Sequence, residues 1–310
     1  MARYARIGVG FDAFDRDPNF VDQIRELALA HDAHLELVHV VPGPTHQVWF
    51  GAGGDPWDRL LCTQRRDQLE AIADGLRADG VDVHCAVPAG EPHIELIRHA
   101  HRTRCELLYI VDEPAERGEG RAFGATTRKL LRKCPKPVWA ARLGSPGRPR
   151  RVVAAIDVWP SSETAERPNA RILDACLRLA GDTDVDLTLL HVWNIWAEEL
   201  LRGRMDEVEF EKAVENAERE HRVRVEDWAL RFEREGMQPS VRLEKGDARS
   251  VLPAAVEQLA PDLVVMGTIC RTGLPGLIIG NTAERILNRL HCAVLTVKPE
   301  GFTSPVPLEG

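Results

Sequence analysis

The sequence predicts an α/β protein built from two tandem doubly wound domains, each with a five-stranded parallel sheet flanked by helices. The length of 310 residues is too great for one typical domain and suits two. Five strand-like runs recur in the same order in the two halves, and helical patterns separate them. Because parallel strands need crossover connections, this alternation predicts a sheet covered on both faces.

The strand-like runs end in the same kinds of residue in both halves. An acid follows the first run, His-Val closes the second, and a glycine ends the third and opens a helix. The matching residues are Asp12 and Asp157, His39-Val40 and His191-Val192, and Gly90 and Gly246. The fourth runs, CELLYIV and PDLVVMG, and the fifth, PVWAAR and AVLTVK, complete the repeat, with Gly124 matching Gly280.

The longest helical pattern extends from Asp206 to Glu235, and Gly236 is expected to end it as a C-cap. Its apolar face recurs at spacings of three and four residues, which is typical of an amphipathic helix. That face consists of Phe210, Val214, Ala217, His221, Val225, Trp228 and Phe232.

The chain divides into residues 1–143, a linker at 144–150, residues 151–299 and a tail at 300–310. The linker lies in the stretch LGSPGRPR, which has the Gly, Ser and Pro content of a connection between domains. The tail contains prolines and no periodicity, so we expect an extended segment that either straps onto the body or stays mobile.

The composition indicates a soluble, folded, cytoplasmic protein. It is 44% hydrophobic and 28% charged, and its formal net charge of −8 with scattered basic residues argues against general nucleic-acid binding. No apolar run is long enough for a membrane span, and no signal peptide precedes the first strand. Seven cysteines without a CxxC pair fit a reducing compartment and are expected mostly in the core.

A ligand is expected at the carboxyl ends of the strands, near the switch point in strand order. In the second half the loop after the fourth strand contains Gly267, Gly273, Gly276 and Gly280, and Asn281 with Thr282 opens the next helix. Glycines let backbone N–H groups approach a phosphate, and a helix start adds unsatisfied donors. The same residues also fit a loop that only turns and caps a helix, so their spacing leaves both interpretations open.

The order of these features resembles the universal stress proteins in their tandem form. The resemblance is carried by the strand-one Asp, the strand-two HV, the Gly-rich loop entering NTAE and the closing VLTVKP, and it covers nearly the whole chain. It implies an adenine nucleotide alpha hydrolase-like fold, a stress-response function, and ATP or AMP as a cofactor of the second half.

Nucleotide-binding members of the family resemble one another in the motif G-x2-G-x9-G-S/T. Carried over to this sequence, their ligand positions are Asp157, Val192, Gly267, Gly280 and Asn281. The sequence departs from the motif, because Cys270 replaces its second glycine and Asn281 follows its last, with Thr282 one residue later. A side chain at position 270 would crowd the approach of backbone to phosphate, so we expect weakened nucleotide binding.

The first half departs further from the motif. Val111 takes the place of Gly267, and the acids that follow it would repel a polyphosphate. We therefore expect a solvated loop without a ligand, followed by a good helix start at Gly124, and a first half that is structural. The acids are Asp112, Glu113, Glu116 and Glu119.

Other functions remain open, but catalysis is the weakest. The second half could instead hold an apolar or lipid-like molecule, or the protein could be a ligand-free scaffold for stress-response partners. The apolar candidates are Leu274, Leu277, Ile278, Ile279, Trp193 and Trp196. No GK[ST] follows the glycines and no lysine lies in the loop, so we expect no catalytic residues and at most weak ATP hydrolysis.

Histidines and cysteines do not indicate a metal or a catalytic base. His39 and His191 lie in apolar strands, where a hydrogen-bonded core histidine is expected. Cys270, His291 and Cys292 lack a zinc-ligand spacing.

The two halves are expected to pair within one chain, as the subunits of a family homodimer do. The last strands, Val138–Arg142 and Val294–Lys298, would then lie together across a pseudo-two-fold axis and cover two sheet edges. The sequence leaves open whether two chains form a homodimer.

Overall fold

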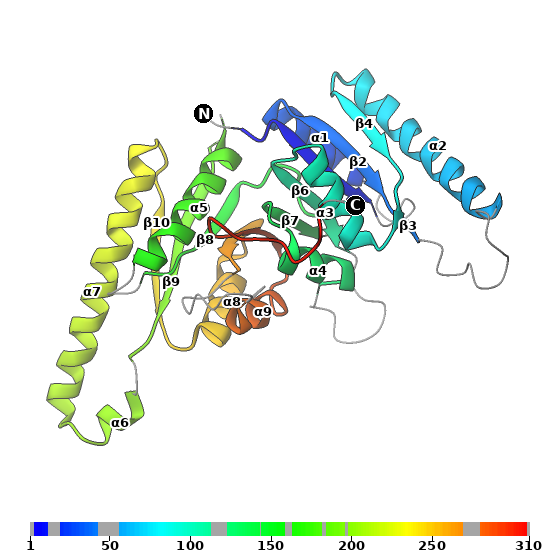
Figure 1. Ribbon diagram of the computed structural model, residues 1–310. Coiled ribbons are helices and arrows are strands. Elements are labelled where there is room, and N and C mark those ends of the chain that lie inside the picture. The colour runs from blue at the N-terminus through cyan, green and yellow to red at the C-terminus, as the bar shows by residue number, and fades with distance from the viewer. Residues whose placement is uncertain are drawn as a thin grey trace.

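The computed structural model describes residues 3–11, 19–42, 56–112, 123–142, 144–158, 163–181, 184–195, 198–268 and 280–308. Two similar series of strands and helices follow one another along the chain (Figure 1). The first series consists of β1 (Arg6–Phe11), α1 (Phe20–His31), β2 (His34–His39), β3 (Val41–Pro42), α2 (Pro56–Ala78), β4 (Val83–Ala86), β5 (Ala89–Gly90), α3 (Pro92–Arg102), β6 (Leu107–Asp112), α4 (Ala125–Lys133) and β7 (Val138–Arg142).

The second series repeats the first from the linker onward. It consists of β8 (Arg151–Ala155), α5 (Glu163–Ala180), β9 (Asp186–Trp193), α6 (Glu198–Arg202), α7 (Glu207–Arg234), β10 (Ser240–Lys245), α8 (Ala248–Leu259), β11 (Leu263–Gly267), α9 (Asn281–Leu287) and β12 (Ala293–Val297). Gly90 is the last residue of β5 and Gly246 directly follows β10, with φ of 154° and 141°, a backbone region that favours glycine, and a helix follows each.

All the long strands join one sheet of ten strands in the order β10-β9-β8-β11-β12-β7-β6-β1-β2-β4. Neighbours are parallel within each half, while β12 and β7 are antiparallel, with Leu295 opposite Trp139. The predicted pairing of the last strands is confirmed. It leaves only β10 and β4 as outer edges of this sheet, and β3 pairs separately with β5.

Each half is a five-stranded doubly wound unit, as predicted. Numbered within a half, the strand order is 3-2-1-4-5, so the direction of winding reverses between strands one and four. In the second half this switch point lies between β8 and β11, and in the first half between β1 and β6. Open α/β sheets bind ligands at the carboxyl ends of such strands.

The helices cover the two faces of the sheet and form one core on each face. One core packs α1, α2, α5 and α7 against the sheet and the other packs α3, α4, α8 and α9 against it, and each extends through both halves. Trp139 on β7 is 1% exposed at the centre of the sheet. The halves therefore share their cores and are not connected by the linker alone.

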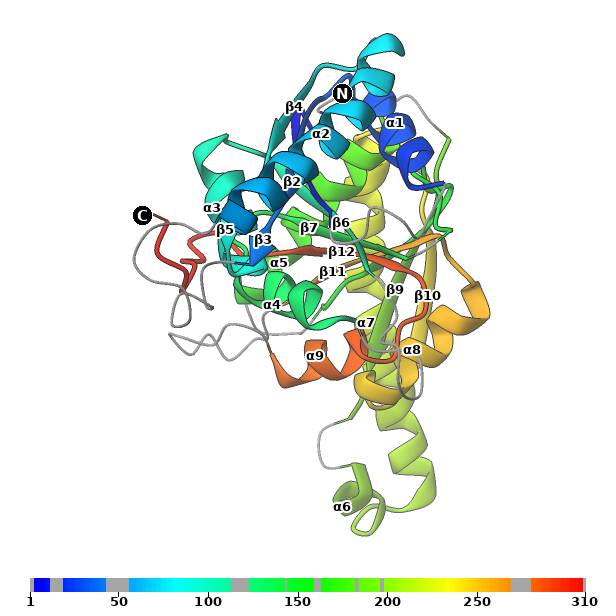
Figure 2. The same ribbon diagram turned by 90° about the vertical axis from the view of Figure 1, so that its right-hand side faces the viewer.

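Helix α7 confirms the longest predicted helix. Asp206 caps its start by accepting a hydrogen bond from the Glu209 N–H, and Gly236, with φ of 89°, follows its end. The two views of the ribbon show α6 and the adjoining end of α7 projecting beyond the body of the protein (Figure 2). The buried residues of α7 include Phe210, His221, Val225, Trp228 and Phe232.

The linker and the tail both pack on the body. A Cβ atom added to Gly147 would overlap the carbonyl oxygen of Gln23 on α1, so the linker touches that helix. The Ser304 hydroxyl donates to the Lys133 carbonyl at 2.8 Å, Arg98 Nε donates to the Pro307 carbonyl at 3.0 Å, and Val306 is buried. The tail thus straps onto the first half.

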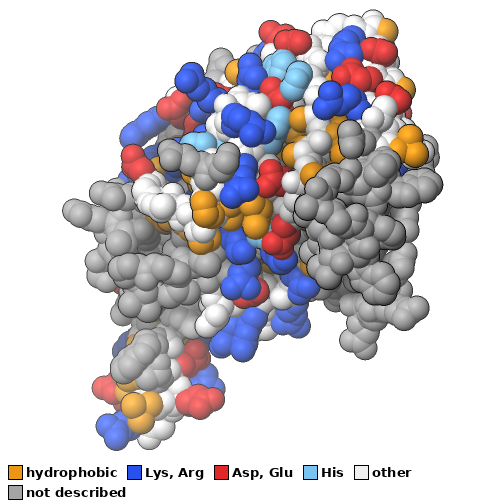
Figure 3. Space-filling model, turned by 45° about the vertical axis from the view of Figure 1, so that its right-hand side comes forward, with side chains coloured by type: hydrophobic (Ala, Val, Ile, Leu, Met, Phe, Trp, Pro, Cys, Tyr) orange, Lys and Arg blue, Asp and Glu red, His pale blue; other side chains and the backbone are white. Residues whose placement is uncertain are grey.

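The surface carries charges of both signs. Figure 3 shows Lys and Arg side by side with Asp and Glu across one face. None of the described helices is long and apolar enough to cross a bilayer. Of the six cysteines in the described ranges, four are buried, as expected of core residues, and burial raises their pKa. They are Cys85, Cys105, Cys134 and Cys176.

Candidate functional site

Three of the predicted ligand residues lie at the carboxyl ends of β8, β9 and β11, beside the switch point. Asp157 follows β8, Val192 lies near the end of β9, and Gly267 is the last residue of β11. Gly280 immediately precedes α9, so that Asn281 and Thr282 form its first turn, as predicted. Cys270 and Gly276 lie outside the described residues.

Helix α5 fixes the backbone of Asp157. The Asp157 N–H donates to Asn169 Oδ1 at 3.1 Å, and Asn169 Nδ2 donates to the Asp157 carbonyl at 2.8 Å. Asn169 is 1% exposed, while Asp157 is half-buried, so the amide end of this contact lies in the core. The sequence pattern did not identify Asn169, because it lies inside a helix and far from Asp157 along the chain.

Two histidines hold the carbonyl groups on either side of Asp157. His191 Nδ1 donates to the Ile156 carbonyl at 3.1 Å, and His221 Nδ1 lies 3.2 Å from the Val158 carbonyl. The rings are stacked, with His221 Nδ1 also 3.0 Å from His191 Nε2. His221 was predicted only as part of the apolar face of α7, and the structure shows that it also contacts the Val158 carbonyl and His191.

The first half contains the equivalent of one of these contacts. His39 Nδ1 donates to the Phe11 carbonyl at 3.0 Å, and Phe11, like Ile156, immediately precedes the strand-one Asp. His39 and His191 are both buried and hydrogen-bonded, so the prediction of core histidines is confirmed.

The fold does not require glycine at position 267. A Cβ atom there would meet Pro168 Cβ at 3.8 Å, which is ordinary contact, and the residue has no positive φ. Gly280 donates its N–H to the Thr268 carbonyl at 2.9 Å, which joins the start of α9 to the end of β11. Thr268 and Gly280, the described residues on either side of the loop, are thus hydrogen-bonded to each other at the end of β11.

Lys298 contacts Thr268 at the end of β11 and connects it to α4 of the first half. Its Nζ donates to Thr268 Oγ1 at 2.7 Å and to the Leu131 carbonyl of α4 at 2.6 Å. The side chain is buried, and burial lowers the pKa of Lys298 to about 7. The sequence analysis treated Lys298 only as the end of a strand.

In the first half a carboxylate takes the place of the Thr268 hydroxyl. Asp112 Oδ1 accepts a hydrogen bond from the Gly124 N–H at 2.8 Å, and Oδ2 accepts one from Arg142 Nη1 at 2.8 Å. Burial raises the pKa of Asp112, against the hydrogen bonds from Thr127 and Gly124 and the charge of Arg142. The expectation of a solvated acid that repels a ligand is wrong for Asp112, because this carboxylate is buried in an ion pair.

Gly124 does begin a helix, as predicted, since α4 starts at the next residue. The other acids of this loop, Glu113, Glu116 and Glu119, lie outside the described residues. The internal carboxylate of Asp112 occupies the start of α4, the position where a ligand phosphate would be expected to bind.

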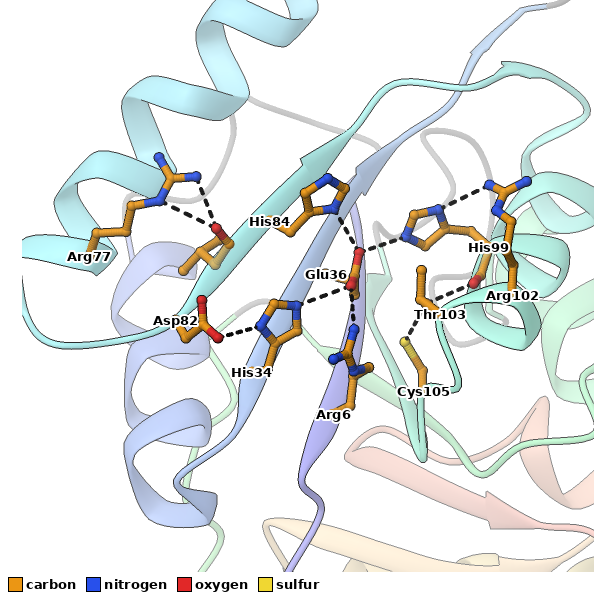
Figure 4. Close-up of polar contacts among 11 residues, drawn as sticks. Arg6, His34, Glu36, Arg77, Asp82, His84, His99, Arg102, Thr103 and Cys105 are labelled. Atoms are coloured by element: carbon orange, nitrogen blue, oxygen red, sulfur yellow. Dashed lines mark hydrogen bonds and ion pairs between the residues drawn. The ribbon is translucent and has the colours of Figure 1, made fainter.

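A second polar cluster lies on the first half and is formed by side chains of β1, β2, β4 and α3 (Figure 4). Its centre is the carboxylate of Glu36, which is 3% exposed. Arg6 Nη1 and His34 Nε2 bond one oxygen, and His84 Nδ1 and His99 Nε2 bond the other, all at 2.9 to 3.0 Å. Within the described ranges, no three or more His, Cys, Asp or Glu side chains are arranged to hold a metal ion.

Two cavities lie along the seam between the halves and contain none of the predicted ligand residues. One, of about 670 Å³, is lined by Arg3, Arg148 and other residues near the linker. The other, of about 450 Å³, is lined by Tyr4, Arg171, Phe302 and their neighbours. The chemistry at the strand ends, rather than cavity size, therefore defines the candidate site.

Comparison with models of known protein families shows to which family the chain belongs. A model described as the Universal stress protein family matches residues 3–142 and again residues 149–298. The chain belongs to the universal stress protein family. The two matches correspond to the two halves of the ten-stranded sheet.

Curated relatives include universal stress proteins E of two enterobacteria. Universal stress protein E of Salmonella typhi is 29% identical over 215 residues, which cover 69% of this chain and 66% of the relative. Universal stress protein E of Escherichia coli (strain K12) is 28% identical over 204 residues, covering 66% of this chain and 64% of the relative. The matched stretch thus spans slightly less than two thirds of each relative.

Solved structures show the same fold across nearly the whole chain. A protein of unknown function from Pseudomonas aeruginosa PAO1 has a TM-score of 0.72 and 21% identity, covering 96% of this chain and 93% of its own. A universal stress protein from Archaeoglobus fulgidus has a TM-score of 0.67 and 16% identity, covering 94% and 98%.

Proposed function

We propose that this universal stress protein is a regulatory module of the stress response that binds an adenine nucleotide, ATP or AMP, in its second half. The observation that supports the second half is the exchange of Asp112 for Thr268 at equivalent positions of the repeat. In the first half, an internal carboxylate already accepts the N–H group that opens α4. In the second half the Gly280 N–H bonds the Thr268 carbonyl, and the side chain at this position is a neutral hydroxyl, so no internal carboxylate from this position competes with a phosphate.

Asp157 is the residue to which we assign the ribose or base of the nucleotide. It lies at the switch point, where doubly wound sheets bind ligands, and Asn169 holds its peptide group on both sides. We propose binding rather than catalysis, because efficient hydrolysis needs a metal-held phosphate and a positioned water. The loop sequence supplies neither a lysine nor a GK[ST] motif.

The structure weakens the hypothesis of an apolar ligand. Trp193 is 4% exposed and stacks on His221 at a centroid distance of 5.5 Å, so its ring is occupied in the core. The other apolar candidates lie outside the described residues. We also infer a cytoplasmic location, since the six cysteines of the described ranges are free thiols.

Isothermal titration with ATP and with AMP tests the proposed function. We expect a single nucleotide per chain, and an affinity at least about tenfold lower in Asp157→Ala, the loss expected from a charged hydrogen-bond acceptor. Asp12→Ala is the matched control in the first half and should bind as wild type does. Absence of binding to wild type, or equal losses in both variants, would contradict the proposal.

The departure from the family motif gives a second variant. Cys270→Gly should strengthen ATP binding, because it removes the side chain that crowds the backbone approach to phosphate. Native mass spectrometry of freshly purified protein identifies any ligand that is already bound. An apolar metabolite released on denaturation would favour the alternative, and unchanged affinity in Cys270→Gly would refute the steric argument.

A further inference from the structure

The peptide groups around Asp157 are held by side chains from three separate elements. Asn169 of α5 bonds both the N–H and the carbonyl of Asp157. His191 of β9 bonds the carbonyl before it, and His221 of α7 lies within hydrogen-bond distance of the carbonyl after it. Beyond the end of β8, the Ile156 N–H still bonds the Leu190 carbonyl of β9 at 3.1 Å, and the three side chains hold the peptide groups that follow this bond.

The three side chains are deeply buried. Asn169 and His191 are each 1% exposed and His221 is 4% exposed. Burying a polar group is costly unless it is hydrogen-bonded, and apolar side chains of similar size could fill these positions without that requirement. The polar groups therefore fix the orientation of this backbone, which packing alone would not specify.

The contacts also assign the protons of the two rings. A carbonyl oxygen can only accept, so His221 Nδ1, beside the Val158 carbonyl, carries a proton. That N–H also faces His191 Nε2, which must then accept, and His191 carries its proton on Nδ1 toward the Ile156 carbonyl. One directed chain of hydrogen bonds thus runs from α7 through β9 to the residue before Asp157.

We propose that Asn169, His191 and His221 are positioning residues, which hold the backbone of residues 156–158 so that Asp157 faces the ligand. This inference rests on the proposed function of the second half. A segment held in its bound orientation loses less conformational freedom when the ligand arrives, so these contacts raise affinity without touching the ligand.

The repeat provides a matched control for a test by substitution. His221→Phe keeps the stacking on Trp193 and removes the donor, while His221→Gln restores a donor. His39→Phe removes the equivalent of the His191 contact in the first half, at a similarly buried position. We expect His221→Phe and His39→Phe both to lower the melting temperature, because each removes a hydrogen bond to a backbone carbonyl.

ATP affinity then separates positioning from stability. We expect about a tenfold loss in His221→Phe, recovery in His221→Gln and wild-type affinity in His39→Phe. If wild type binds ATP and His221→Phe binds it equally well, the positioning role is overturned while the proposed function stands.

Hydrogen exchange tests the same inference without a ligand. The Asp157 amide should exchange at least about tenfold faster in Asn169→Leu than in wild type, because its acceptor is lost. An unchanged rate would overturn the positioning role even if wild type failed to bind ATP. Failure of ATP binding alone would count against the proposed function only.

Discussion

Arg142 and Lys298 each donate a hydrogen bond to a backbone carbonyl in the other half of the chain. Arg142 Nη2 bonds the Leu290 carbonyl at 3.0 Å, and Lys298 Nζ bonds the Leu131 carbonyl at 2.6 Å. Each also bonds a side chain of its own half, Asp112 or Thr268. The two basic side chains are therefore placed symmetrically across the seam, but Arg142 is paired with a carboxylate and Lys298 with a hydroxyl.

The buried amine of Lys298 should make stability depend on pH. Burial lowers its pKa from 10.5 to about 7 in the folded protein. Between these values the unfolded chain binds more protons than the folded one, so the free energy of unfolding should rise with pH, by up to about 1.4 kcal/mol for each pH unit. Urea unfolding from pH 7 to pH 10 measures this slope.

Lys298→Met is the control for that slope, since it keeps the length of the side chain and removes the titrating group. Its free energy of unfolding should change much less over the same range. An equal slope in both proteins would assign the pH dependence to another group.

The Asp112–Arg142 pair should be strongly coupled. Asp112→Asn leaves the guanidinium buried without its carboxylate and should lower the free energy of unfolding by about 3 kcal/mol. The double substitution Asp112→Thr, Arg142→Lys copies the pair of the second half and should recover part of the loss. A double-mutant cycle from denaturant unfolding measures the coupling, and additive losses would show that the pair does not act as a unit.

The Glu36 cluster should weaken the first half on acidification. Burial opposes ionisation, yet hydrogen bonds from His84, His99 and His34 hold the pKa of Glu36 below its usual value of 4.5. This contribution is present above pH 4.5 and is lost as pH falls through the folded pKa. Burial also lowers the pKa of His99 below 6.5, so protonation of this ring disfavours the folded state as pH falls.

Hydrogen exchange between pH 7 and pH 4 distinguishes the halves. Protection of β2 should fall more than that of β9, and Glu36→Gln, which leaves Arg6 without its carboxylate, should lower protection of β2 already at pH 7. Asp82 also faces the cluster through His34, so Asp82→Asn is the control for its charge. Equal acid sensitivity of β2 and β9 would contradict this assignment.

The linker should not tolerate a side chain at Gly147. Gly147→Ala places a Cβ atom against the Gln23 carbonyl, and the resulting shift of the linker or α1 should cost about 1–3 kcal/mol. Gly75→Ala on α2 meets no atom within 4 Å and should stabilise that helix by up to about 1 kcal/mol. Thermal unfolding of the two variants should therefore shift in opposite directions, and a neutral Gly147→Ala would show that the linker adjusts freely.

Much of the fold could be predicted because the sequence pattern of each strand occurs once in each half. The runs that end in Asp157 and His191 have counterparts in the first half, and the matching last strands implied the antiparallel seam. The placement of Asp157, Val192 and Gly267 at neighbouring strand ends also followed, since strand order determines which loops meet.

The residues that support the site could not be predicted, because each belongs to a pattern with another explanation. Asn169 lies within a helix, and His221 falls on the apolar face of α7, where a histidine is expected to pack. Asp112 follows a strand among other acids, and only the fold brings Arg142 to it. Glu36 lies opposite His84 because of the register between β2 and β4, and α3 brings His99 to it from the face of the sheet. Neither arrangement can be recognised from a short stretch of sequence.

The tail gives the protein a closing step that is late in its synthesis. Residues 304–308 are made after both halves, yet Val306 enters the core beside α4, and Ser304 and Pro307 bond residues of the first half. During synthesis, the first half has all its strands before these residues are made. The core of the half that is made first is therefore completed by residues that are made after the second half.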